Sequence, residues 1–79
     1  MFFSSFAMSA KGPDEGVRTD QGILLVNLEE YKQAKEILKA ESEKGDAEAT
    51  FWLAVAMYKS GQHFEAGDVF LKAAKLGDP

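Results

Sequence analysis

Residues 45–78 read GDAEATFWLAVAMYKSGQHFEAGDVFLKAAKLGD, a stretch that begins and ends with the same Gly-Asp pair. Such a glycine can end one helix in a left-handed conformation, and the aspartate after it can accept a hydrogen bond from a free backbone N–H of the next helix. Between the two pairs, apolar residues recur at helical spacing on both sides of Ser60 and Gly61, where we expect a turn. The stretch therefore predicts a helical hairpin, with its second helix running from about Gln62 to Leu76.

The same pattern recurs earlier in the chain. A shift of 32 residues superposes three aspartates, two glycines and two alanines without a gap: Asp14, Asp46 and Asp78; Gly45 and Gly77; Ala34 and Ala66. Internal repetition at a fixed period indicates a helical repeat architecture. We predict a first repeat over residues 14–45, a second over residues 46–77, and the start of a further repeat at residues 78–79.

The first repeat follows this plan less closely. Its apolar residues are interrupted by a turn near residues 27–30, and Glu41 and Ser42 occupy the positions of an alanine pair in the second repeat. Residues 23–26 also have strand propensity, but a lone strand has no partner to pair with. We therefore predict a degenerate cap repeat and an all-α fold of two antiparallel helical hairpins, four helices in all.

Composition narrows the classes of function. The 79 residues carry a formal net charge of −4 with no cluster of Lys and Arg, which argues against a nucleic-acid partner. Cysteine is absent, so no disulfide supports a core that must be thin in so short a chain. No run approaches the roughly 20 apolar residues of a membrane span, and we expect no membrane insertion.

Residues 1–13 are expected to be a flexible tail or the remnant of a signal peptide. The segment Met1–Ala10 is apolar and ends in small residues, like the back half of a secretory signal, but it has no basic residues at its start. A truncated signal would place the protein in the periplasm or outside the cell. A plain tail would leave it in the cytoplasm.

The second repeat resembles the SEL-like repeats and their tetratricopeptide relatives. The residues that carry the resemblance are Gly45-Asp46-Ala47-Glu48-Ala49, Leu53-Ala54, Met57-Tyr58, Gly61, Ala66, Phe70, Lys72-Ala73-Ala74 and Gly77-Asp78. The resemblance implies a right-handed superhelix and a bacterial protein that binds a peptide or protein partner through the concave surface of the first helix of each repeat. The 32-residue period is shorter than is usual in this family, and only two repeats are present.

Candidate contact residues follow from that resemblance. They are the residues of the first helices that would line the concave surface: Glu48, Phe51, Val55 and Tyr58 in the second repeat, and Ile23 and Val26 in the first. The alternative is that the apolar ones are packing residues, as aromatic stripes often are. Trp52 is expected to lie in the core, and the only histidine, His63, in a solvated turn.

No catalytic, cofactor-binding or metal-binding group stands out. One histidine and no cysteine offer no evident acid/base pair or nucleophile, so we do not expect an enzyme. The carboxylates at Glu29, Glu30, Glu36, Glu41 and Glu43 alternate with lysines and are expected on a solvated helix face.

Three functions therefore remain open. The first is a protein-binding adaptor, the second an immunity or inhibitor protein that blocks a toxin or secreted effector, and the third a fragment of a longer structural solenoid. Two hairpins leave apolar flanks at both ends of the stack, so we also expect self-association, with a homodimer as the simplest form.

Overall fold

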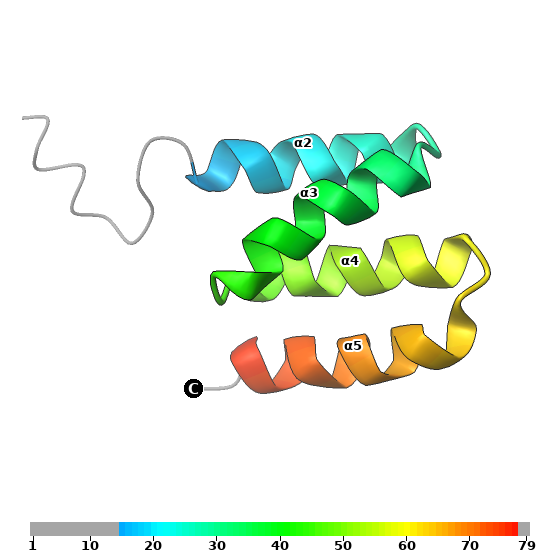
Figure 1. The fold of residues 1–79 in the computed structure, drawn as a ribbon. Helices are drawn as coiled ribbons and strands as arrows, with labels where there is room; N and C mark the ends of the chain where they lie inside the picture. Colours follow the sequence, from blue (N-terminus) through cyan, green and yellow to red (C-terminus); the bar gives the residue numbers. More distant parts are fainter. Residues whose placement is uncertain (1–14, 78–79) are drawn as a thin grey trace, which may run out of the picture.

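A computed structural model describes residues 15–77, and these residues form four helices joined by short turns (Figure 1). The helices are α2 (Glu15–Asn27), α3 (Tyr31–Glu43), α4 (Ala47–Lys59) and α5 (His63–Gly77). No strand occurs within this range, which confirms the prediction of an all-α fold. None of these helices combines the length and the apolar character that crossing a membrane requires. The predictions for residues 1–13 and 78–79 lie outside the described part of the chain.

The helices repeat with the period found in the sequence. Helices α2 and α4 begin at residues 15 and 47, and α3 and α5 begin at residues 31 and 63, so both pairs are offset by 32 residues. Helix α2 packs against α3 and α4, and α4 packs against α3 and α5. Figure 1 shows the result, a stack in which α2 and α5 form the opposite ends.

The joint between the hairpins has the capping chemistry that the Gly-Asp pair predicted. Gly45 has a φ of 92°, which an L residue rarely adopts. Asp46 is the N-cap of α4, and its Oδ1 accepts hydrogen bonds from the backbone N–H groups of Glu48 (3.0 Å) and Ala49 (3.2 Å). Glu29, in the turn before α3, also has a positive φ of 65°, and nothing in the sequence marked it.

The core is built mainly from small residues around one large side chain. Leu38 is fully buried, and a Cβ added at Gly22 would overlap its side chain, so α2 and α3 approach closely only because residue 22 is glycine. Between α4 and α5 the same role belongs to three buried alanines: Ala54, Ala66 and Ala73. Small residues let helix axes approach to about 8 Å.

A second group of buried residues is polar. Thr19, Glu41, Ser42 and Thr50 are all at most 5 % exposed, and they lie where α2, α3 and α4 meet. The Thr19 hydroxyl donates to Asp46 Oδ2 (2.8 Å), and the hydroxyls of Ser42 and Thr50 are hydrogen-bonded to each other. Every buried side-chain oxygen and nitrogen of the described residues has a partner, as stability requires.

The expectation that Glu41 lies on a solvated face is wrong. Its side chain is 2 % exposed, and its Oε2 is 3.2 Å from Arg18 Nε and 3.3 Å from Lys44 Nζ. Position 41 is equivalent to Ala73 under the 32-residue shift, so it points between the helices of the hairpin. A carboxylate is tolerated there because two cations approach it from the solvent side.

Candidate interaction surfaces

Helix α4 presents an exposed stripe that contains the candidate residues of the second repeat. Glu48, Phe51, Val55 and Tyr58 follow each other at intervals of three and four residues, so they share one face of the helix. Phe51 is 44 % exposed and Tyr58 53 %, whereas Val55 is partly buried against the core. Because α4 is the first helix, or helix A, of the second repeat, we call these four residues the helix-A stripe.

The aromatic rings of the helix-A stripe are held by neighbours. The Phe51 ring is edge-on to Trp52, with centroids 5.7 Å apart, and to Phe70 of α5, with centroids 5.6 Å apart. The ring centroids of Tyr58 and His63 are 4.4 Å apart, and His63 is itself exposed. Such contacts restrict the rotamers of half-exposed rings, and a preordered ring loses less entropy when a partner covers it.

The candidates of the first repeat divide between surface and core. Ile23 is partly exposed on α2, a helix that contacts α4. Val26 is 2 % exposed and belongs to the core cluster with Ala34 and Leu38, so its side chain offers no surface to a partner. Trp52 is partly buried and packs against the same cluster, as expected for a core tryptophan.

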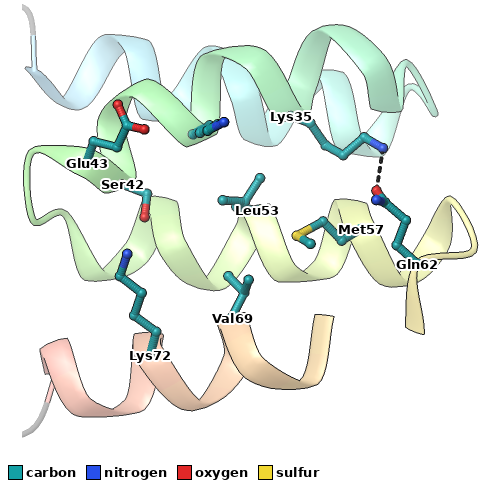
Figure 2. A pocket seen from close by; sticks show the side chains of 9 residues that line it. Lys35, Ser42, Glu43, Leu53, Met57, Gln62, Val69 and Lys72 are labelled. Carbon is teal, nitrogen blue, oxygen red and sulfur yellow. Dashed lines mark hydrogen bonds between the residues drawn. The ribbon is translucent and has the colours of Figure 1, made fainter. Parts of the chain in front are cut away.

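A groove lies on the other side of α4, between α3 and α5 (Figure 2). Its volume is about 450 Å³, and its floor consists of three apolar side chains, Leu53, Met57 and Val69. Polar side chains surround that floor: Lys35, Lys39, Ser42 and Glu43 from α3, Gln62 from the last turn, and Lys72 from α5. Leu53 and Val55 are two residues apart, about 200° around the helix, so the groove and the helix-A stripe occupy opposite faces of α4.

The rim of this groove has an excess of positive charge. It carries three lysines and one glutamate. Lys35 is already engaged, because its Nζ donates to Gln62 Oε1 (2.7 Å) and to Ser60 Oγ (3.2 Å). Neither Lys39 nor Lys72 has an ion-pair partner within residues 15–77. An apolar floor beside two such ammonium groups suits a ligand that combines an apolar group with a carboxylate.

The groove was not predicted from the sequence. Its lysines were interpreted as part of a solvated helix face, because alternating charges on a helix are usually solvated. The signal missed was the spacing of Lys35 and Lys39, which lie one turn apart on the same face of α3. This helix is flanked by both α2 and α4. Only the packing of α5 beside α4 shows that these lysines and Lys72 surround one concavity.

The described residues 15–77 contain no group of three or more His, Asp and Glu side chains arranged to hold a metal ion. Comparison of the chain with protein-family models, with curated proteins and with solved structures found no match. The resemblance to the SEL-like and tetratricopeptide repeats therefore remains a prediction from the residues quoted above.

Proposed function

We propose that this chain is a protein-binding module of the SEL-like or tetratricopeptide-like kind, which binds a peptide or protein through the surface formed by α2 and α4. The observation that carries the proposal is the half-exposed pair of aromatic rings at Phe51 and Tyr58, one on each side of Val55. Aromatic side chains dominate binding energy at protein interfaces when they become fully buried. In this proposal Glu48 and Ile23 lie at the edge of the contact.

The surroundings of the helix-A stripe support this role. Phe51 is anchored by Phe70, a residue of the neighbouring helix, so the two helices of the second hairpin position one aromatic cluster. Helix α4 itself is fixed by the Asp46 cap and by its contacts with three other helices. A rigid scaffold beneath exposed aromatic groups is what a binding surface requires.

A second candidate function is a repeat unit of a longer structural stack. The observation that favours it is the exposure of large apolar residues on the outer faces of α2 and α5, at both ends of the molecule: Val17, Leu24 and Leu28 on α2, and Phe64 and Leu71 on α5. In a stack of repeats those faces contact neighbouring repeats.

The adaptor proposal can be tested with a displayed peptide library, because the partner is unidentified. Peptides selected against the full chain are synthesised, and their affinities are measured by isothermal titration calorimetry. The double variant Phe51→Ser and Tyr58→Ser changes the helix-A stripe. The double variant Lys39→Glu and Lys72→Glu changes the groove on the opposite face and serves as the matched control.

We expect the helix-A variant to weaken binding of the selected peptides at least about tenfold, since two partly buried rings are lost from the interface. The groove variant should leave the affinity within about twofold. The reverse result would move the site to the groove and contradict the proposal. Selection that yields no peptide with a Kd below about 1 mM would also contradict it.

A further inference from the structure

Within residues 15–77 there is one joint between hairpins, the packing of α3 against α4. On the α4 side it uses a stripe at positions 49, 53, 56 and 60, which fall on one face of the helix. On the α3 side it uses positions 35, 38, 39 and 42. The joint thus has two halves, and each half has an equivalent elsewhere in the chain under the 32-residue shift.

The equivalent of the α4 half is the outer face of α2. Its residues are Val17, Gln21, Leu24 and Leu28, and we call them the head stripe. Val17 is 52 % exposed, Leu24 56 % and Leu28 60 %, and Gln21 is exposed as well. No described helix covers this face, since α2 contacts only α3 and α4.

The equivalent of the α3 half is the outer face of α5. Its residues are Gly67, Phe70, Leu71 and Ala74, and we call them the tail stripe. Leu71 is 58 % exposed, Gly67 and Ala74 are exposed, and Phe70 is partly buried by its contact with Phe51. Among the described helices α5 contacts only α4, so the tail stripe is uncovered (Figure 1).

The tail stripe is more apolar than the α3 half of the internal joint to which it corresponds. Lys35, Lys39 and Ser42 of α3 are replaced by Gly67, Leu71 and Ala74 on α5. A terminal face of a repeat stack is normally polar, because solubility requires it. Phe64, which is 88 % exposed one turn away, adds to the apolar surface. The outer face of α5 therefore has the apolar composition of a covered surface.

Gly67 points to a close approach by an outside group. Glycine in the middle of a helix costs roughly 1 kcal/mol relative to alanine. No neighbouring group of the chain lies within 4 Å of a Cβ added at this position, so packing inside the molecule does not require glycine there. In the internal joint the equivalent residue, Lys35, reaches Ser60. Under the 32-residue shift Lys35 and Ser60 correspond to Gly67 of the tail stripe and Leu28 of the head stripe. A smaller residue on one stripe is thus matched by a larger one on the other.

We propose that the tail stripe of one copy docks on the head stripe of a second copy and repeats the α3–α4 joint between molecules. The contact is heterologous, because two different faces of the chain meet. Each pair therefore leaves one head stripe and one tail stripe free, so copies can add in line. This proposal does not depend on the helix-A stripe, which lies on neither of the two end faces.

Four full-length variants test the geometry. Variant H carries Leu24→Glu and Leu28→Glu in the head stripe, and variant T carries Gly67→Glu and Leu71→Glu in the tail stripe. All four positions are exposed, so the monomer should fold, and thermal melting followed by circular dichroism checks this. Glutamate is used at both ends so that the altered stripes repel each other. Gln33→Glu, an exposed position outside both stripes, is the control, and Gly67→Ala is the conservative variant.

Light scattering from about 10 μM to about 1 mM should show a mass that grows beyond the dimer for the wild-type chain and for the Gln33→Glu control. Variants H and T alone should stay monomeric, with association weakened roughly 100-fold or more, because each contact would bury unpaired carboxylates. An equimolar mixture of H and T should form a one-to-one heterodimer and stop there, since each partner supplies one intact stripe.

Four results would overturn the proposal. A wild-type monomer at every concentration means that nothing outside the chain covers the stripes, or that another segment of the same chain does. Homodimers of variant H mean a symmetric contact of α5 with α5, and homodimers of variant T mean α2 with α2. Association that survives in both variants means a contact elsewhere, residues 1–14 included.

Discussion

The two hairpins share their helix boundaries and differ in what lies between the helices. In the first hairpin position 41 holds a buried glutamate, and in the second the equivalent position holds Ala73. In the first hairpin Gly22 packs against Leu38. In the second hairpin the equivalent residues are Ala54 and Phe70. The first interior is therefore tight and partly ionic, and the second is made of alanines with an aromatic edge.

This difference follows from the number of neighbours of each helix. Helix α3 is covered by both α2 and α4, so its polar side chains Glu41 and Ser42 are buried and need hydrogen-bond or ion-pair partners. Among the described helices only α4 covers α5, and Ala74, the equivalent of Ser42, is exposed. The position in the stack, more than the local sequence, decides whether a repeat position is buried.

The largest loss of stability is expected in the core, where Leu38 of the first hairpin is more deeply buried than its equivalent in the second. Leu38→Ala should lower the free energy of unfolding by about 3 kcal/mol, since it removes the largest fully buried side chain and leaves a cavity. Phe70→Ala, at the equivalent position, should cost only about 1 to 2 kcal/mol, because Phe70 is partly exposed. Urea denaturation followed by circular dichroism measures both. Equal losses would contradict the comparison.

A glycine pair gives the next contrast. Gly22→Ala should destabilise the chain by about 2 kcal/mol, since the new methyl group overlaps Leu38 and outweighs the helix preference of alanine. Gly67→Ala should stabilise it by about 0.5 to 1 kcal/mol, since its surroundings inside the molecule are empty. Melting curves at a protein concentration that keeps both variants monomeric make the measurement. Opposite signs are required, and a stabilising Gly22→Ala would refute the close approach of α2 and α3.

The joint between the hairpins should respond to loss of its cap. Asp46→Ala removes the acceptor of two backbone N–H groups of α4 and of the Thr19 hydroxyl, and we expect a loss of about 1 kcal/mol. Asp46→Asn keeps a capping oxygen and should recover most of that stability. Amide hydrogen exchange at Glu48 and Ala49 reports the cap directly. Unchanged protection in the alanine variant would show that the cap contributes nothing.

The smallest effect is expected from the ion pairs at Glu41. Arg18→Ala should cost about 0.5 kcal/mol, because the arginine is 52 % exposed and water competes for the pair. The loss should shrink in 1 M NaCl, where the screening length is about 3 Å. Lys59→Ala, an exposed lysine at the end of α4, is the control and should change stability by less. A loss that is insensitive to salt would argue against an electrostatic origin.

Much of the local structure could be predicted because it depends on neighbouring residues. The Gly45-Asp46 pair marks a helix end and a helix start through backbone chemistry that acts within a few residues, and the structure shows both. The burial of Ala54 and Ala66 follows from helical spacing. The candidate contact residues came from the resemblance to helical repeats and stay a prediction, and one of them, Val26, lies in the core.

Features that join distant residues could not be predicted. Glu41 and Arg18 are 23 positions apart, and nothing in a pattern of alternating charges distinguishes a buried carboxylate from a solvated one. Lys39 and Lys72 come to one groove only because α3 and α5 both pack against α4, one on each side of it. Contacts between residues so far apart in the sequence depend on how whole helices are oriented.

The sequence by itself determined the four helices, their 32-residue period and the turns between them, because these follow from spacing, capping and backbone conformation over a few residues. The tertiary structure alone decided which faces are covered, where charges meet, and that no other helix of residues 15–77 covers the outer faces of α2 and α5. The physical reason is that burial is a property of neighbours in space. Two helices with the same repeat positions acquire different surroundings when one is inside the stack and the other at its end.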